Sequence, residues 1–386
     1  MSHKNNSPIR VMRIIARMNV GGPAVQVSGL MRGINPSEFD QRLYTGFCGA
    51  DEADYLETVA RDVIAIRIAG FGRRVSLGGD IKAFISLVKE IRSFKPHVIH
   101  THTAKAGFLG RIASIVSLHP SIRVHTFHGH LLNGYFGQFK RSLVVLAEKL
   151  LAIFTHELLA VGEKIRQDLL DAGVGNLEKF GIMPPGLALG KLPPKKESQK
   201  YFGISPSKLQ CAFIGRVTQI KRPDRFLNVV SEVVKRGAEV EFFMAGDGDL
   251  LDVCRARIAR EDLPVKILGW QNDIEIVLSA ADVVILTSDN EGTPLSLIQA
   301  GMAGLPVVTT NVGSISEIVL DGTTGIITGL EVHEIAGAIE KLVNNTKLRD
   351  RLGSAAQAFT TANFGVQRLV NDHENLYRKL TNRAMF

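Results

Sequence analysis

The chain of 386 residues alternates short apolar runs with longer stretches of helical spacing, and it does so in two series. Short apolar runs predict buried strands, and a strand–helix–strand order predicts a parallel sheet with helices on both faces. The first series of predicted strands covers residues 11–16, 43–48, 97–100, 122–127 and 157–161. The second series covers residues 210–214, 240–245, 265–268, 282–287 and 305–309. We therefore expect an α/β protein with two doubly wound, Rossmann-like sheets, in which ligands bind beyond the carboxyl ends of the strands.

A proline-rich segment separates the two series. Its sequence, MPPGLALGKLPPKKESQK, contains four prolines and a cluster of lysines, which is typical of a linker. The chain is long enough for two domains of ordinary size. We expect a first domain over residues 1–187, a second over residues 188–365, and a helix over residues 366–380 within a C-terminal segment of residues 366–386. A cleft is expected between the two domains.

The net charge of +8 lies entirely within residues 1–190, and the rest of the chain is balanced. A basic first domain favours an anionic acceptor or an acidic membrane surface. Residues 140–154 add an amphipathic helical pattern, which is typical of helices that lie on a membrane. The alternative is an ordinary solvated basic surface. Nucleic acid is disfavoured as a partner, because the basic residues are scattered and no recognised binding motif accompanies them.

The cysteines and the apolar runs favour a cytoplasmic location. Cys48, Cys211 and Cys254 are widely spaced and odd in number, which predicts reduced thiols rather than disulfides or a zinc site. The sequence has no uninterrupted apolar run of about 18 residues and no apolar N-terminal segment of the signal-peptide type. We expect a cytoplasmic protein, with peripheral attachment to the inner face of the cell membrane as a further expectation.

The strongest chemical signal lies in the segment DVVILTSDNEGTPLSLIQAGMAGLPVVTT. It predicts a buried strand, a polar loop, and a helix with Thr293 as its N-cap and Pro294 at its first position. The free amides of Leu295 and Ser296 would then form an anion site suited to a diphosphate. Glu291, at the strand end, would reach a bound sugar. The alternative is an ordinary strand–helix corner whose glutamate favours the helix dipole.

A second motif, AFIGRVTQIKRPD, also follows a predicted strand. Gly215 allows the backbone to approach a ligand closely. Arg216 and Lys221 would place two positive charges on a leaving diphosphate, and such charges replace a metal ion. No metal and no cofactor are therefore expected. The alternative is an exposed basic loop.

Two further features are weaker signals. Gly21 and Gly22 predict a tight turn that exposes backbone amides before a helix, although the full dinucleotide-binding spacing is missing. His128, at a strand end, is interpreted as a hydrogen-bond donor to the donor sugar or the acceptor. A metal site is disfavoured, because no carboxylate or cysteine set joins the neighbouring histidines, which are His100, His102, His125 and His130. The run Asp247-Gly248-Asp249 is expected to form a turn.

Together these motifs resemble glycosyltransferase family 4, the retaining, nucleotide-sugar-dependent enzymes of the GT-B fold. The resemblance spans nearly the whole chain. It rests on the glycine turn, His128, Arg216 with Lys221, Leu268-Gly269-Trp270, and above all NEGTPLSLIQAGMAGLPVV. It implies a metal-independent, retaining transfer of a hexose or N-acetylhexosamine from a nucleotide sugar, with a UDP-sugar as the expected donor. The acceptor would be a glycan or lipid-linked saccharide in cell-surface polysaccharide synthesis.

The resemblance also implies roles for individual residues. Arg216 and Lys221 would hold the diphosphate, Glu291 would contact the donor sugar, and the final helix would cross back to the first domain. The residues expected to take part in catalysis are Glu291, His128, Arg216 and Lys221. The residues expected at the donor site are Gly21, Gly22, Gly215, Arg216, Lys221, Leu268, Trp270, Glu291, Gly292, Thr293, Pro294, Leu295 and Gln299.

The chain departs from the family pattern at Gln299, where the family usually has a second glutamate that bonds the ribose hydroxyls. An amide still offers an acceptor oxygen, but losing a charge-assisted hydrogen bond costs about 1–2 kcal/mol of affinity. Two alternatives stay open: a nucleotide-sugar-binding protein without transferase activity, and a UDP-sugar 2-epimerase of the same architecture. The donor sugar and its nucleotide, the acceptor, the linkage and the oligomeric state do not follow from the sequence.

Overall fold

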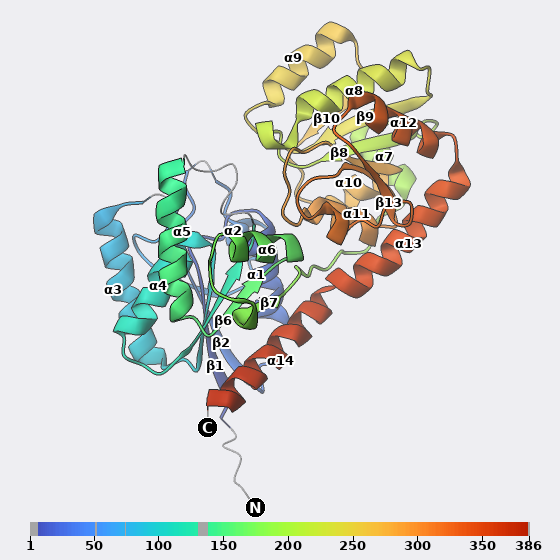
Figure 1. Ribbon diagram of the computed structural model, residues 1–386. Helices are drawn as coiled ribbons and strands as arrows, with labels where there is room; N and C mark the ends of the chain where they lie inside the picture. The colour runs from blue at the N-terminus through green and yellow to red at the C-terminus, as the bar shows by residue number, and fades with distance from the viewer. Residues whose placement is uncertain (1–6, 51, 74, 130–137, 385–386) are drawn as a thin grey trace, which may run out of the picture. The chain divides into compact units, whose positions relative to one another are not determined.

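The computed structural model describes residues 7–50, 52–73, 75–129 and 138–384 (Figure 1). The chain divides into two compact units. The first unit comprises Met1–Leu187 and Val366–Phe386, and the second comprises Ala188–Gly365. The division at Leu187 falls inside the proline-rich segment.

The first unit is built on a parallel sheet of seven strands in the order β3-β2-β1-β4-β5-β6-β7. The strands are β1 (Ile9–Ile15), β2 (Phe39–Thr45), β3 (Ala65–Arg67), β4 (Val98–His102), β5 (Ile122–Phe127), β6 (Glu157–Ala160) and β7 (Phe180–Ile182). The order reverses between β1 and β4, which are neighbours in the sheet. In such sheets ligands bind at this reversal, outside the carboxyl ends of the strands.

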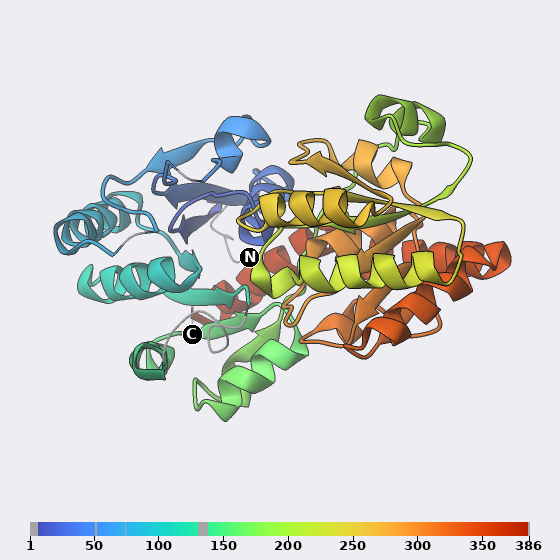
Figure 2. The same ribbon diagram turned by 90° about the horizontal axis from the view of Figure 1, so that it is seen from above.

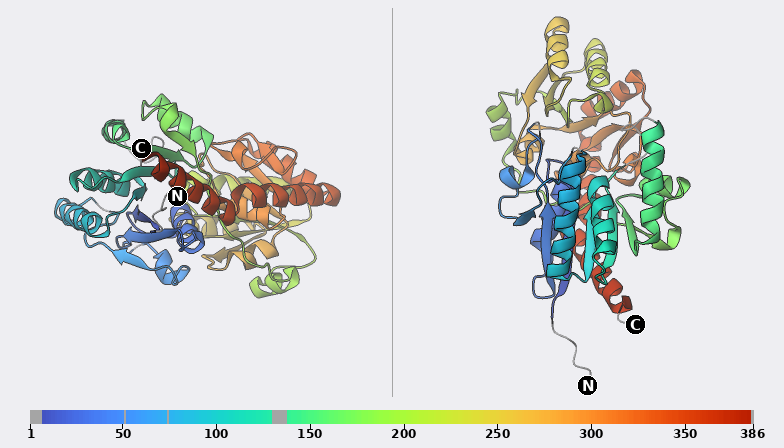
Figure 3. Two further views of the ribbon diagram at one scale, coloured as in Figure 1. Left: turned by 90° about the horizontal axis from the view of Figure 1, so that it is seen from below. Right: turned by 90° about the vertical axis from the view of Figure 1, so that its left-hand side faces the viewer.

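Helices cover both faces of the first sheet. The helices are α1 (Gly22–Gly33), α2 (Tyr55–Thr58), α3 (Leu77–Phe94), α4 (Ala104–Val116), α5 (Gln138–Ile153), α6 (Glu163–Asp171) and α14 (Val366–Ala384). Successive strand residues point to opposite faces: Val11 packs with Leu369 of α14, whereas Met12 packs with Leu87 of α3. Helices α3, α4 and α5 lie side by side, as the right-hand view of Figure 3 shows.

The second unit contains a parallel sheet of six strands in the order β10-β9-β8-β11-β12-β13. The strands are β8 (Leu209–Ile214), β9 (Val240–Ala245), β10 (Val265–Gly269), β11 (Val283–Leu286), β12 (Val307–Thr310) and β13 (Gly325–Thr328). Counted within the unit, the order is third, second, first, fourth, fifth, sixth, which is the doubly wound order of a dinucleotide-binding sheet.

The helices of the second unit enclose its core. They are α7 (Lys195–Phe202), α8 (Pro223–Lys235), α9 (Leu251–Glu261), α10 (Ile274–Ala280), α11 (Leu295–Met302), α12 (Val332–Val343) and α13 (Thr346–Phe364). Helix α8 contacts both α12 and α9, and Figure 2 shows α8 beside α9. Phe213 of β8, Phe226 of α8 and Phe242 of β9 are buried in one cluster. This core holds the strand ends that carry the two chemical motifs.

The predicted α/β architecture with two doubly wound parallel sheets is confirmed. The prediction missed three short strands, β3, β7 and β13, which have only three or four residues each and no fully buried run. Among the described residues, no helix has the length and apolar character needed to cross a bilayer.

Candidate functional site

The site in the second unit is built where the strand order reverses, between β8 and β11. Gly215, Arg216 and Lys221 lie in the loop after β8, and Glu291 lies in the loop after β11. Loops that leave neighbouring strands at such a reversal diverge to opposite faces of the sheet, and ligands bind between them. The fold therefore brings together the two motifs that are most informative in the sequence.

The centre of the site is the Glu291 carboxylate. Lys221 Nζ lies 2.5 Å from its Oε1 atom, and Ser288 Oγ donates to the same oxygen at 2.5 Å. Both charged side chains are largely buried, with exposed fractions of 14% for Lys221 and 8% for Glu291. The other oxygen, Oε2, has no hydrogen-bond donor in the described part of the chain. Glu291 is thus held by two donors and keeps one oxygen available to accept from a ligand hydroxyl.

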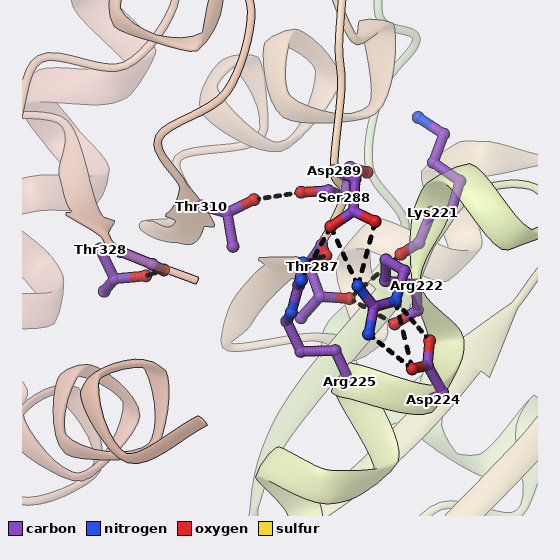
Figure 4. A network of polar contacts seen from close by, with 10 residues as sticks. Lys221, Arg222, Asp224, Arg225, Thr287, Ser288, Asp289, Thr310 and Thr328 are labelled. Carbon is purple, nitrogen blue, oxygen red and sulfur yellow. Dashed lines mark hydrogen bonds and ion pairs between the residues drawn. The ribbon is translucent and has the colours of Figure 1, made fainter. Parts of the chain in front are cut away.

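A polar network joins the loop after β8 to the loop after β11 (Figure 4). The Thr287 hydroxyl donates to the Lys221 carbonyl at 3.2 Å, and Arg225 Nη1 donates to the Thr287 carbonyl at 2.7 Å. The Asp289 carboxylate accepts from Arg222 Nη1 at 3.0 Å and from Arg225 Nη2 at 2.7 Å. In Figure 4 the Lys221 amine points away from this network. The network positions the backbone on both sides of the Lys221–Glu291 pair.

A third loop, after β12, contacts the backbone of Glu291. Ser314 N donates to the Glu291 carbonyl at 3.1 Å. Gly313 has φ +57, and a Cβ atom built there would lie 1.7 Å from the Glu291 carbonyl oxygen. Only glycine fits this position, because any side chain would be both strained and in collision with the backbone. Gly313 and Ser288 are not among the predicted site residues. The available signals are the glycine after the β12 run and the Thr287-Ser288-Asp289 run after β11.

The loops after β8, β9 and β10 are also joined by backbone contacts. Gly215 N donates to the Ala245 carbonyl at 3.0 Å, and Gly246 N donates to the Gly269 carbonyl at 2.8 Å. A Cβ atom at Gly246 would lie 1.9 Å from the Gly215 carbonyl oxygen, so the two loops touch through glycine backbone. The run Asp247-Gly248-Asp249 forms part of the loop between β9 and α9, and the described residues contain no metal-ligand cluster.

The two cations of the second motif are in different surroundings. Lys221 is paired with Glu291, whereas Arg216 is exposed and its side chain has no bonded partner among the described residues. Gly215 lies beside the lysine: a Cβ atom there would be 4.0 Å from Lys221 Cε. Arg216 is therefore the cation of this motif that is available to an anionic ligand.

The start of α11 differs from the prediction by one residue. Pro294, with φ −68 and ψ 112, is the N-cap, and Leu295 is the first helical residue. Thr293 as N-cap is therefore wrong, and its hydroxyl is buried without a partner in the described chain. A proline restricts the residue before it to extended backbone, but the proline itself is free to stay extended, so the helix begins after it. The amides of Leu295 and Ser296 have no acceptor among the described residues.

The remaining residues predicted for the donor site in the second unit lie on β10, on α11 and in the loops next to them. Leu268 is the penultimate residue of β10, and Trp270 follows the strand with 48% of its surface exposed. Its indole Nε1 donates to Asn272 Oδ1 at 3.0 Å. Gly292 is half-buried beside Glu291, and Gln299 is half-buried on α11. Leu268 and Trp270 thus lie at the carboxyl end of β10, which is two strands from β8 in the sheet.

In the first unit, the glycine turn lies where predicted, at the carboxyl end of β1. Gly21 is the N-cap of α1 and Gly22 is its first residue. A Cβ atom at Gly21 would meet no heavy atom closer than 4.0 Å, so the turn is open on its side-chain side. This turn lies at the reversal of the first sheet, beside β4.

His128 follows β5, and its Nε2 atom lies 2.9 Å from His102 Nδ1. Burial lowers the pKa of His128 to about 3, so its ring is neutral near pH 7. His100 and His125 are fully buried and bonded to other side chains, and burial lowers the pKa of each. His130 lies outside the described residues.

Comparisons with known proteins agree with this arrangement. The model described as "Glycosyl transferase 4-like domain" matches residues 21–182, and the model described as "Glycosyl transferases group 1" matches residues 194–359. The chain is 28% identical over 340 residues to the Escherichia coli UDP-Gal:α-D-GlcNAc-diphosphoundecaprenol α-1,3-galactosyltransferase, covering 84% of this chain and 85% of the relative. It is 24% identical to the Staphylococcus aureus capsular polysaccharide biosynthesis glycosyltransferase CapM, covering 79% of this chain and 82% of the relative.

Among solved structures, Anabaena HepE in complex with UDP superposes with a TM-score of 0.80. The match covers 96% of this chain and all of that chain, at 20% sequence identity. At this identity the likeness concerns the fold alone.

Proposed function

Because this chain belongs to the family-4-like glycosyltransferases of the GT-B fold, we propose that it moves a hexose or N-acetylhexosamine from a UDP-sugar to a lipid-linked glycan. We further propose that the transfer retains the anomeric configuration and needs no metal. The observation that carries the proposal is the reversal point of the second sheet. There Glu291 accepts from Lys221 and Ser288, and in the described part of the chain the Arg216 side chain and the amides at the start of α11 have no partner.

Each of these groups has a place in the proposed transfer. Arg216 and the amides of Leu295 and Ser296 bind the diphosphate and stabilise the negative charge that develops as it leaves. They supply the positive charge that a metal ion would otherwise provide. Glu291 accepts a hydrogen bond from a hydroxyl of the donor sugar through Oε2, and the Lys221 contact keeps the carboxylate oriented. The anomeric carbon–oxygen bond breaks, the acceptor oxygen bonds to that carbon, and the acceptor proton leaves with the diphosphate.

The choice of donor and acceptor rests on the relatives. The Escherichia coli relative is named for UDP-Gal and a diphosphoundecaprenol-linked GlcNAc, and Anabaena HepE was solved with UDP-glucose. UDP-galactose and UDP-glucose are therefore the first donors to test, with GlcNAc-diphosphoundecaprenol as the first acceptor.

An apolar stripe on α5 supports peripheral membrane attachment near such an acceptor. Leu143, Leu146, Leu150 and Ile153 lie at helical spacing and are 52–65% exposed. Ile81 on the nearby α3 is also exposed, at 51%. Apolar side chains on the outer face of a basic domain fit the interface of an anionic bilayer.

The decisive experiment is product analysis in EDTA with each UDP-sugar, with and without acceptor. We expect one donor to be consumed only when acceptor is present, giving an α-linked product from the α-configured donor, with Glu291→Gln strongly impaired. Conversion of a donor into another nucleotide sugar without acceptor would instead identify an epimerase. Nucleotide binding without turnover of any sugar would identify a binding protein, and a β-linked product would overturn retention.

A further inference from the structure

Arg13 is a buried cation that has no anionic partner among the described residues. It lies in the middle of β1, and its exposed fraction is 0%. Its Nη1 atom lies 3.3 Å from His102 Nε2 and 3.5 Å from His100 Nδ1, while Nε and Nη2 have no partner in the described chain. Burying a charge without a counter-ion is strongly unfavourable. A hydrophobic residue would suit the fold better at this position, so stability does not explain the arginine.

The groups around Arg13 are neutral. Arg13 is paired in register with His100 on β4, and alternation places His102 on the same face of the sheet. His373 and Tyr377 approach from α14, the helix that packs over this face. Burial is the largest cause of the lowered pKa values of His100, His102 and His373, and the Arg13 charge lowers them further. All three rings are therefore neutral near pH 7.

The hydrogen bonds then determine which nitrogen of each ring carries the proton. A guanidinium group only donates, so His102 Nε2 must accept and the single proton of this neutral ring must lie on Nδ1. His102 Nδ1 therefore donates to His128 Nε2, which lies 2.9 Å away. Because His128 Nε2 accepts, the proton of His128 must lie on Nδ1.

We propose that Arg13 is a positioning residue that acts through His102 to hold His128 as the Nδ1–H tautomer, which presents a neutral donor at the carboxyl edge of the first sheet. The role of that donor toward the reacting sugars rests on the proposed function; the tautomer itself does not.

Two observations at the edge itself support this assignment. His128 Nδ1 has no bonded partner among the described residues, and a Cβ atom at the next residue, Gly129, would meet no atom within 4 Å. Thr103, directly after His102, is held at φ 69 and ψ 156, a region that a β-branched residue rarely adopts. Such strain persists where the surrounding structure determines the backbone, and it is concentrated at functional sites.

The direct test is nitrogen NMR of the full chain labelled with ¹⁵N-histidine. The ring signals of His128 are identified by their loss in His128→Gln. We expect wild type to show a protonated Nδ1 and an unprotonated Nε2, and Arg13→Met to show a mixture of both tautomers. Arg13→Lys, which keeps a donor, should restore part of the wild-type pattern. Arg10→Met, on the same strand, should leave it unchanged. A protonated His128 Nε2 in wild type, or an unchanged pattern in Arg13→Met, overturns the proposal.

Melting temperature and kcat/KM together distinguish a positioning role of Arg13 from a role in folding. Arg13→Met removes an uncompensated buried charge, so we expect a melting temperature equal to or above that of wild type. Transfer from the active UDP-sugar should nevertheless fall by about 10- to 100-fold in kcat/KM, as when the partner that orients a working imidazole is removed. A melting temperature that falls in proportion to activity would mean a structural role only. If wild type transfers no sugar but shows the Nδ1–H tautomer, the proposed function fails and the tautomer assignment stands.

Discussion

Three charged side chains of the proposed donor site have different surroundings. Lys221 and Glu291 neutralise each other in a largely buried contact, and Arg216 stays exposed without a partner in the described chain. In the described part of the chain, this edge thus offers a diphosphate one cation and two amides that have no partner, rather than two equal cations. The geometry of Glu291, however, depends on a residue that carries no charge, Gly313.

Gly313→Ala should therefore disturb the site more than a glycine substitution usually does. The new Cβ atom would lie 1.7 Å from the Glu291 carbonyl oxygen, so the loop must move. We expect a loss of about 2 kcal/mol or more in the free energy of unfolding and a marked loss of UDP affinity. Gly237→Ala is the matched control, because Gly237 also has positive φ but open space around it. Urea unfolding and calorimetry measure both effects; equal losses in the two variants would contradict the proposed contact.

Gln299→Glu should strengthen nucleotide binding. If position 299 faces the ribose, a carboxylate would replace a neutral acceptor with a charge-assisted one worth about 1–2 kcal/mol, or roughly a 5- to 30-fold gain in UDP affinity. Gln299→Ala should lower the affinity instead. Calorimetric titration with UDP decides between these outcomes, and identical affinity in all three proteins would remove Gln299 from the site.

At the scale of elements, a buried ion pair joins α4 to α5. Arg111 Nη2 lies 2.6 Å from Glu148 Oε2, and the two side chains are 1% and 5% exposed. The pair lies on the face of α5 that is turned inward. The opposite face is consequently turned outward, and it carries the exposed leucines of the apolar stripe.

Glu148→Leu should be strongly destabilising, because it leaves the Arg111 charge buried and unpaired. We expect a loss of about 3–5 kcal/mol in the free energy of unfolding, measured in urea. The double variant Arg111→Met with Glu148→Leu should recover most of this loss, since it removes both charges. A double variant as unstable as Glu148→Leu alone would show that packing rather than charge is responsible.

The apolar stripe of α5 should control membrane attachment. Replacing Leu146 and Leu150 with glutamate removes two apolar side chains, each worth about 1.5–3 kcal/mol when buried, and adds negative charge. Flotation with anionic liposomes at low salt should fall by at least about 10-fold. Val253→Glu on α9 of the second unit, where Val253 is 63% exposed, is the control and should float like wild type. Wild type that does not float at all would disprove the attachment.

At the scale of the whole molecule, histidine burial should make stability depend on pH. Burial lowers the pKa of seven imidazoles in the described part of the first unit, which are those of His97, His100, His102, His125, His128, His156 and His373. In the unfolded chain these imidazoles gain protons near pH 6.5, whereas in the folded chain they stay neutral to a lower pH. The free energy of unfolding is therefore undiminished above pH 6.5 and decreases as the pH falls below it. Each imidazole lowers the free energy of unfolding by up to about 1.4 kcal/mol per pH unit below 6.5.

Urea unfolding at pH 7.5 and pH 5.5 measures this dependence. We expect a clear loss of stability at the lower pH, and a smaller loss in His373→Phe, which removes one of the seven groups. Equal stability of wild type at both pH values would contradict the neutral state of the cluster.

Local patterns predicted most of the strands and both loops of the donor site, because apolar runs and strand-end motifs are local properties of the sequence. The pairing of Lys221 with Glu291 joins residues 70 positions apart, and no local pattern reveals it. Arg13 lies within an apolar run that predicts a strand, but its burial depends on α14, whose Tyr377 is 277 residues from His100. The start of α11 was misplaced because a proline fits both the N-cap and the first turn.

Calorimetric titration of UDP, GDP and ADP in EDTA, on wild type and on Arg216→Ala, tests whether the reversal of the second sheet binds the donor. We expect UDP to bind selectively without metal and Arg216→Ala to weaken this binding by about 10-fold or more, because a charged hydrogen bond is lost. Failure of wild type to bind any of the three nucleotides, or UDP binding unchanged in Arg216→Ala, would contradict a donor site at the reversal of the second sheet.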